Sequence, residues 1–264
     1  LPRWIAKKLH SIATTDNHTT TQQPPRSSNP ITIVCISDTH TTQPALPPGD
    51  ILLHAGDLSQ YGLFDEIQAQ LIWLNAQPHR HKLVVAGNHD LLLDSAFVAS
   101  HPDRELDRLP GKRRADLDWG AVTYLDNSTV DIACHTGGGE RLLRIYGSPW
   151  TPQCGNFAFQ YPAADADDKT DPWKNTIPPS TSILLTHGPP LHHLDERKGC
   201  PRLLKEIRRA RPQLVVFGHI HGARGEDVLR LDDDAEVRYE DVVAGTRPWR
   251  NVGALVLLVV WGRL

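Results

Sequence analysis

The sequence has few cysteines and no disulfide pattern. Four cysteines are spread over 264 residues, and none of them forms a C-x-x-C pair. A chain of this length can bury a full hydrophobic core without cross-links, so we expect free thiols and a reducing compartment. The sequence therefore predicts an intracellular protein, located in the cytoplasm.

The sequence also lacks a long apolar run and a strong excess of one charge. The longest apolar run, residues 254–261, is far shorter than the roughly 20 residues of a transmembrane helix. The formal net charge is -3, from 28 basic and 31 acidic residues. A general binder of nucleic acid has a marked basic excess, so we expect neither a nucleic-acid partner nor a membrane partner. The composition leaves the oligomeric state open.

The N-terminal segment differs from the rest of the chain. Residues 1–29 are rich in Thr, Gln, Pro and Ser, and they predict a tail or linker whose role is left open. Methionine is absent from the first position and from the whole sequence, so we expect the natural N-terminus to lie outside it. Residues 30–264 are predicted to form one domain.

Short apolar runs at the start of this domain predict buried strands. They cover residues 31–36, 51–55 and 82–86, and residues 64–76 between the last two have apolar side chains at helical spacing. The order strand, helix, strand indicates a crossover and a parallel sheet. A second helix is expected over residues 91–100.

The second half of the domain alternates between strands and loops. Strands are expected over residues 122–125, 130–133 and 141–146, with a hairpin turn at residues 137–139. Strands at 182–186 and 214–217 flank a helix at 201–209, and residues 237–243 and 254–261 predict a closing hairpin. The long loop 147–180 is rich in aromatic residues, which favours core or lid packing over the stacking of a base.

Short polar clusters follow the predicted strands at their C-terminal ends. Open α/β sheets bind their ligands at that edge, so we expect one site built from the whole fold. The clusters are Ser37-Asp38-Thr39-His40, Gly56-Asp57, Gly87-Asn88-His89-Asp90, Thr186-His187-Gly188-Pro189-Pro190 and Gly218-His219-Ile220-His221-Gly222.

The clusters supply carboxylate, amide and imidazole donors of the kind that bind metals. Any one of these residues is more often a turn aspartate or a surface histidine. Together they are too many for one tetrahedral zinc and too rich in oxygen for a thiolate site. They favour two divalent ions, Mn, Fe or Zn with Mg as a further candidate, bridged by one carboxylate. The predicted donors are Asp38, His40, Asp57, Asn88, His187, His219 and His221.

The order of these motifs resembles the calcineurin-like metallophosphoesterase superfamily. The motifs are Asp-x-His, Gly-Asp, Gly-Asn-His-Asp, a single His and Gly-His-x-His. Residues 144–150 and 186–190 are similar to the metallophosphoesterase-domain-containing (MPPED) subgroup. The resemblance implies an α/β fold, a four-layer α/β/β/α sandwich of two mixed sheets flanked by helices.

The resemblance also implies a role for each site residue. One metal would be held by Asp38, His40 and His221, and the other by Asn88, His187 and His219, with Asp57 as the bridge. His89 matches the histidine that contacts the substrate phosphate, and Asp90 the acidic residue that orients it. Some MPPED members have glycine at the position of His219, so its presence here predicts a dinuclear centre.

These roles predict a dinuclear, metal-dependent hydrolase of phosphate esters. The resemblance implies a phosphodiesterase that acts on small diesters similar to cyclic nucleotides through a hydroxide bridging the metals. His89 would stabilise the phosphoryl oxygens or protonate the leaving group. The alternatives are a phosphomonoesterase or protein phosphatase, and a scaffold that keeps the fold without catalysis. The expected partner is a small phosphate ester.

Overall fold

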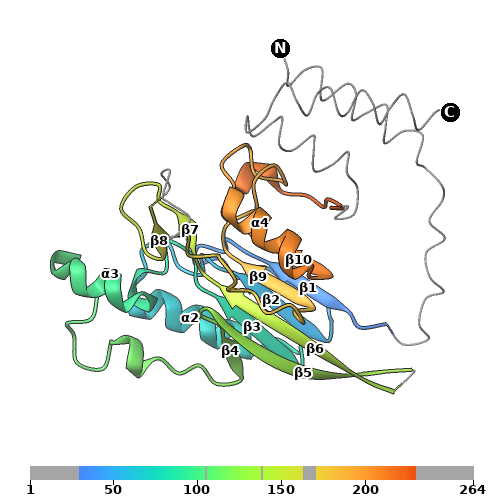
Figure 1. Ribbon diagram of the computed structural model, residues 1–264. Coiled ribbons are helices and arrows are strands. Elements are labelled where there is room, and N and C mark those ends of the chain that lie inside the picture. Colours follow the sequence, from blue (N-terminus) through green and yellow to red (C-terminus); the bar gives the residue numbers. More distant parts are fainter. Residues whose placement is uncertain (1–29, 105, 138, 163–170, 230–264) are drawn as a thin grey trace, which may run out of the picture. The chain divides into compact units, whose positions relative to one another are not determined.

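The centre of the fold is a parallel sheet of four short strands (Figure 1). The structure is a computed structural model, and it describes residues 30–104, 106–137, 139–162 and 171–229. The strand order of this first sheet follows the sequence, and each strand pairs in parallel with the next. The strands are β1 (Ile33–Ile36), β2 (Ile51–Ala55), β3 (His81–Val85) and β4 (Val122–Tyr124).

A second sheet of four strands has the order β10-β9-β6-β5. In it β6 is parallel to β9 and β9 to β10, whereas β5 and β6 form an antiparallel hairpin that confirms the predicted turn. The hairpin is longer than the sequence pattern indicated. The strands are β5 (Ser128–Thr136), β6 (Gly139–Ser148), β9 (Ile183–Thr186) and β10 (Leu214–Val216).

The hydrophobic core forms two clusters, one of them between the two sheets. Ile51 and Leu53 of β2 pack in one cluster with Ile145 of β6 and Leu185 of β9. Leu52, which alternates with them along β2, packs on the opposite side of the first sheet. Because β2 is buried on both faces, its sequence is a continuous apolar run rather than an alternating one.

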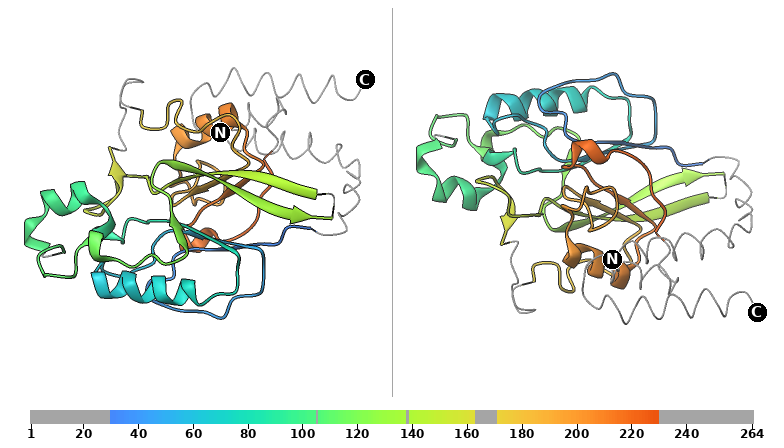
Figure 2. Two further views of the ribbon diagram at one scale, coloured as in Figure 1. Left: turned by 90° about the horizontal axis from the view of Figure 1, so that it is seen from below. Right: turned by 90° about the horizontal axis from the view of Figure 1, so that it is seen from above.

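Helices cover the outer face of each sheet. Ile67, Leu71 and Leu74 of α2 (Phe64–Asn75) pack on the first sheet and are fully buried. Figure 2 shows α4 (Pro201–Ala210) on the other side of the two sheets. The four-layer α/β/β/α sandwich is confirmed, although in the described residues the first sheet is parallel and only the second is mixed.

The helix predicted over residues 91–100 is interrupted. A single 3-10 turn, η1 (Leu91–Leu93), is followed by α3 (Ser95–Ser100). Asp94 separates them because its carboxylate accepts hydrogen bonds from the backbone N–H groups of Ala96 and Phe97, both at 3.0 Å. An aspartate in this position caps the start of a helix, so the apolar pattern alone missed the break.

Segments without a clear sequence pattern contain short 3-10 turns and strands. The charged segment after α3 contains the 3-10 turns η2 (Pro102–Arg104) and η3 (Arg114–Asp116). The long aromatic loop contains two short paired strands, β7 (Thr151–Pro152) and β8 (Gln160–Tyr161). A last 3-10 turn, η5 (His221–Ala223), follows β10. Among the helices described, none has the length and hydrophobicity needed to cross a bilayer.

Some predictions lie outside the described residues. These are the tail at 1–29 and the closing hairpin at 237–243 and 254–261. The predicted boundaries of the domain, 30–264, therefore stay predictions.

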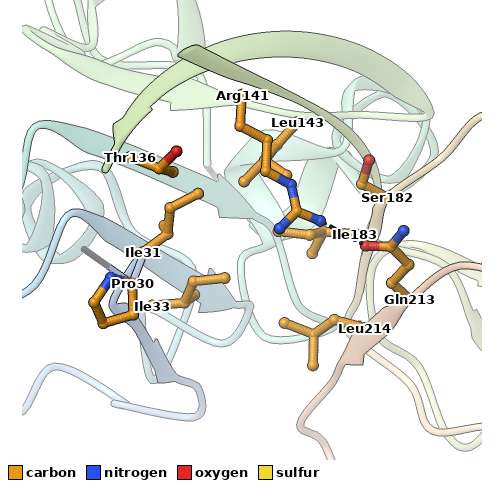
Figure 3. Close-up of a pocket in the computed structure, with 10 residues that line it drawn as sticks. All are labelled: Pro30, Ile31, Ile33, Thr136, Arg141, Leu143, Ser182, Ile183, Gln213 and Leu214. Carbon is orange, nitrogen blue, oxygen red and sulfur yellow. Dashed lines mark hydrogen bonds between the residues drawn. The ribbon is translucent and has the colours of Figure 1, made fainter. Parts of the chain in front are cut away.

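A pocket of about 410 Å³ opens between the sheets at the N-terminal ends of their strands (Figure 3). Ile33 of β1 and Ile31, just before it, line the pocket on one side, and Ile183 of β9 and Leu214 of β10 line it from the second sheet. The Arg141 guanidinium donates a hydrogen bond to the Gln213 side-chain oxygen at 3.1 Å on its wall. The polar clusters described next follow the opposite, C-terminal ends of the strands.

Candidate metal centre

The chain turns sharply after β1, which brings Asp38 and His40 to the same side. Along an extended strand their side chains would point to opposite faces. The backbone φ angles are 52° at Asp38 and 43° at His40, in the left-handed region. This conformation is uncommon for residues other than glycine, and such strain concentrates at functional sites. Backbone hydrogen bonds from Asp38 to Gly56, 2.9 Å, and from His40 to Asp57, 3.1 Å, hold the turn.

Asp57 lies in the middle of the site. Its Oδ2 is 3.6 Å from His40 Nε2 and 3.4 Å from His187 Nε2. Its Oδ1 accepts a hydrogen bond of 2.8 Å from the backbone N–H of His89. One carboxylate oxygen therefore lies between histidines from different parts of the chain, which is the position that a bridging ligand needs.

The first group of donor atoms surrounds His40. Ligand atoms of Asp38, His40, Asp57 and His221 all lie within 4.8 Å of one another. The Nε2 atoms of His40 and His221 are 3.4 Å apart, and His221 Nε2 is 3.3 Å from Asp38 Oδ1. The backbone N–H of His219 donates to both Asp38 oxygens, at 3.0 and 3.1 Å. Asp38 therefore joins the turn after β1 to the turn after β10.

The second group surrounds His187, which follows β9. Ligand atoms of Asp57, His187 and His219 lie within 4.8 Å of one another. The Asn88 Oδ1 is 3.0 Å from His187 Nε2, and the rings of His187 and His219 meet edge to face with centroids 4.9 Å apart. Asp57 belongs to both groups, so the two halves predicted from the sequence are adjacent and share it.

Backbone carbonyls orient two of the imidazoles. His40 Nδ1 is 3.2 Å from the carbonyl oxygen of Ser59, and His187 Nδ1 is 2.8 Å from that of Ala55. A carbonyl only accepts, so Nδ1 is the donor in each ring, and in a neutral imidazole the lone pair is then on Nε2, which faces the centre. Histidine ligands of metals are oriented in this way. The residues present therefore fit divalent cations in both groups.

Burial and neighbouring charges shift the pKa values of the buried groups of the centre in both directions. Burial alone would lower the pKa of His187, but the Asp57 carboxylate outweighs it and raises the pKa to about 9. In the same way, burial would raise the pKa of Asp57, but the charge of His187 holds it well below its usual range. Burial and the neighbouring His187 lower the pKa of His219 to about 4. His219 is therefore neutral at pH 7 and can bind an ion directly, whereas His187 must release its proton to bind one.

His89 and Asp90 occupy different surroundings. His89 Nδ1 is 2.8 Å from the carbonyl oxygen of Gln60, and its ring meets the edge of the His40 ring at 4.8 Å. The Asp90 carboxylate accepts from the backbone N–H groups of Gly87, Leu58 and Ser59 at 2.7, 3.2 and 2.9 Å. In the described residues, the hydrogen bonds of Asp90 go to the loops that follow β2 and β3. The Gln60 carbonyl, rather than Asp90 as predicted, is the group that orients His89.

The Asp90 carboxylate is fully buried. Burial and the charge of Asp57 raise its pKa to about 6. It also accepts a hydrogen bond of 2.6 Å from the Ser59 hydroxyl. This arrangement ties the loop after β2 to the loop after β3.

The profile of the calcineurin-like phosphoesterase family matches residues 12–223, most of the chain. The matched range includes every predicted donor. The chain belongs to the calcineurin-like phosphoesterase family. This membership confirms the resemblance and supports the prediction of a phosphoesterase domain.

Curated relatives agree with this assignment. The chain is 38% identical to metallophosphoesterase domain-containing protein 1 of Homo sapiens and of Mus musculus, over 73% of the chain and 61% of each relative. It is 41% identical to a probable rhamnogalacturonate lyase C of Emericella nidulans, over 89% of the chain. The chain spans 21% of that protein, so the similarity concerns one portion of a much longer polypeptide.

Two glycines of this calcineurin-like site have no room for a side chain. A Cβ on Gly87 would overlap the Asp57 carboxylate, and a Cβ on Gly218 would overlap the Asp38 carboxylate. Glycine is needed because the backbone passes directly behind a ligand. Glycine at these two positions therefore lets the backbone approach a carboxylate of the site closely.

The sequence patterns missed the residues that support the phosphoesterase centre. The carbonyls of Ser59 and Gln60 orient His40 and His89, and no side-chain signal identifies a carbonyl. His54 is fully buried, and burial lowers its pKa to about 4. Its Nε2 lies 3.0 Å from the Thr39 hydroxyl, so it buttresses the turn between Asp38 and His40.

Proposed function

We propose that this protein hydrolyses phosphate esters at a centre of two divalent metal ions and prefers small diesters similar to cyclic nucleotides. The observation behind the proposal is the position of Asp57, whose Oδ2 lies between His40 and His187 and belongs to both donor groups. One group would hold the first ion through Asp38, His40 and His221. The other would hold the second ion through Asn88, His187 and His219.

Bound divalent ions supply a nucleophile derived from water near neutral pH and positive charge for the phosphoryl oxygens. Mixed oxygen and imidazole donors suit Mn, Fe or Zn, and Mg is a further candidate. The chain itself supplies His89, whose Nδ1 is held by the Gln60 carbonyl. Its Nε2 is therefore the atom that donates to a phosphoryl oxygen or protonates the leaving group.

The preference for diesters is more specific than the hydrolysis of phosphate esters in general. It is supported by the similarity to the metallophosphoesterase domain-containing proteins. The imidazole of His219, which keeps the second donor group complete, supports the dinuclear centre. A phosphomonoesterase or protein phosphatase would use the same donors. A scaffold without catalysis would tolerate the loss of donors, and every predicted donor is present here.

The test is a substrate panel with metal analysis. The full chain is loaded with Mn and assayed on bis-p-nitrophenyl phosphate, p-nitrophenyl phosphate and the cyclic nucleotides, next to Asp57→Asn. We expect faster hydrolysis of the diesters and about two metal equivalents. Asp57→Asn should lose activity by more than about 100-fold, since residues beyond the ligands alone account for 10–100-fold. Hydrolysis of none of these esters by metal-loaded protein would favour the scaffold.

We also propose the predicted intracellular location. All four cysteines, Cys35, Cys134, Cys154 and Cys200, are free thiols in the structure. Free thiols are typical of proteins from reducing compartments.

A further inference from the structure

One aromatic side chain of the long loop differs from the others in its surroundings. Trp173 is fully buried and Phe159 nearly so. Trp150 meets Trp173 edge to face at 5.9 Å, so these rings pack on one another. Phe157, in the segment between β7 and β8, is 37% exposed. Most of the loop's aromatic residues are therefore structural, and Phe157 is available to a ligand.

Phe157 lies beside the centre. Its ring centroid is 4.8 Å from that of His89, with an angle of 35° between the ring planes. His89 in turn meets the edge of the metal-ligand candidate His40 at 4.8 Å. Ring contacts therefore connect Phe157 through His89 to His40, a member of the first donor group. A group esterified to a phosphate that touches His89 is thus within reach of Phe157.

The backbone around Phe157 is held in place. Ala158 donates its backbone N–H to the Asn88 carbonyl at 3.1 Å, and Phe159 donates to Asp94 Oδ2 at 2.8 Å. Both acceptors belong to the segment that follows β3. A ring anchored in this way loses little freedom when it binds a ligand. Scattered exposed apolar residues are normal, so the contact with His89 matters more than the exposure.

We propose that Phe157 forms an aromatic subsite that stacks a planar ring attached to the phosphate of the substrate. This inference rests on the proposed function and narrows its substrates to phosphate esters with a nucleobase or another aryl group. Stacking of a base on an aromatic side chain is sequence-tolerant because every base has a π face. We therefore expect selection for an aromatic ring rather than for one particular base.

The test compares two ligands that differ only in the base. Binding of adenosine 5′-monophosphate and of ribose 5-phosphate to the Mn-loaded full chain is measured by calorimetry, and metal content is determined for each sample. The wild type should bind the nucleotide about 5- to 150-fold more tightly, the range that stacking on one aromatic ring provides. In Phe157→Ala the ratio of the two affinities should fall close to 1. In Phe157→Trp the ratio should stay near the wild-type value.

The matched control is Leu142→Ala. Leu142 is also an exposed apolar residue, but it lies near the start of β6, away from the strand ends that form the centre. This variant should keep the wild-type ratio. Phe157→Leu retains an apolar side chain beside His89. Its affinity ratio should also fall close to 1, while its metal content should stay that of the wild type.

The outcomes separate this inference from the proposed function. Equal binding of the two ligands by the wild type, or an unchanged ratio in Phe157→Ala, overturns the aromatic subsite even if diesters are hydrolysed. A ratio that depends on Phe157 in a protein that hydrolyses no ester keeps the subsite and overturns the enzyme proposal. Failure of both ligands to bind overturns the subsite, and the substrate panel then decides the proposed function by itself.

Discussion

Asp57 is the residue on which both halves of the centre depend. Its Oδ2 lies within 3.6 Å of a ring nitrogen of His40 and of His187, and its Oδ1 is occupied by the backbone of His89. The hydrogen bond from His89 fixes the carboxylate, so the same oxygen is presented to both donor groups. A change at Asp57 therefore affects both metals and the position of His89 together.

His89 contributes differently, and its substitution should separate chemistry from metal binding. We predict that His89→Asn keeps the metal content but lowers kcat on diesters with poor leaving groups by about 10²–10⁴-fold, the usual contribution of a general acid. A p-nitrophenyl leaving group needs no protonation, so the loss should be much smaller on bis-p-nitrophenyl phosphate. Steady-state kinetics on both substrates, with metal analysis, provide the measurement.

The matched control for His89→Asn is His135→Asn. His135 is an exposed histidine of β5, paired across the hairpin with Glu140. This control variant should behave as the wild type. An equal loss on good and poor leaving groups would contradict the role of His89 as an acid and leave only phosphate binding.

The loop after β2 positions the histidines of the site. The carbonyls of Ser59 and Gln60, neighbours in this loop, orient His40 and His89. Asp90, from the loop after β3, accepts hydrogen bonds from Leu58 N–H, Ser59 N–H and the Ser59 hydroxyl. Asp90 is therefore a positioning residue that acts through the loop.

We predict that Asp90→Asn weakens both stability and metal affinity. An amide places an NH₂ group against backbone N–H donors, which leaves buried groups unsatisfied at a cost of about 1–3 kcal/mol. The loop would shift with its two carbonyls, and metal affinity should fall by about 10–100-fold, as for other partners that orient ligands. Denaturant unfolding and titration with Mn measure the two effects.

A buried carboxylate elsewhere in the fold serves as the control. Glu206 of α4 accepts from the Ile177 backbone N–H at 3.0 Å and pairs with Arg209 at 2.6 Å. Glu206→Gln should lower stability by a similar amount and leave metal affinity unchanged. If Asp90→Asn lowered stability alone, the role of Asp90 would be structural only.

At the scale of the whole molecule, the centre joins the two sheets. Asp38, Asp57 and Asn88 follow strands of the first sheet, whereas His187 and His219 follow strands of the second. Because each donor group takes ligands from both sheets, bound metal would cross-link them at the C-terminal ends of the strands. The fold and the centre should therefore be coupled in stability.

We predict that removal of metal by a chelator lowers the melting temperature. A ligand that binds only the folded state at 100 times its Kd adds about 2.7 kcal/mol, which for a domain of this size is a shift of roughly 5–10 °C. Scanning calorimetry with and without Mn gives the shift. Removal of metal should hardly change the melting temperature of Asp57→Asn. The control Asp131→Asn changes an exposed carboxylate of β5 and should show the full wild-type shift. An identical melting temperature with and without metal would contradict the coupling.

The sequence by itself determined the order of strands and ligands. Apolar runs followed by polar donors need no knowledge of distant contacts, since each strand and its terminal cluster are contiguous in the chain. For this reason β2, α2 and the donor list from Asp38 to His221 could be predicted. The break at Asp94 could not, because the same carboxylate that caps α3 is held by Phe159, distant in sequence.

The tertiary structure alone decided how the donors meet. Asp38 and Asp57 adopt a left-handed backbone that places their carboxylates in the site. The carbonyls that orient His40 and His89, and the ring of Phe157 beside His89, come from segments far away in the sequence. Backbone groups have no residue identity, so a sequence pattern cannot encode them. Donor type is a property of single residues, but distance and orientation depend on the packing of both sheets.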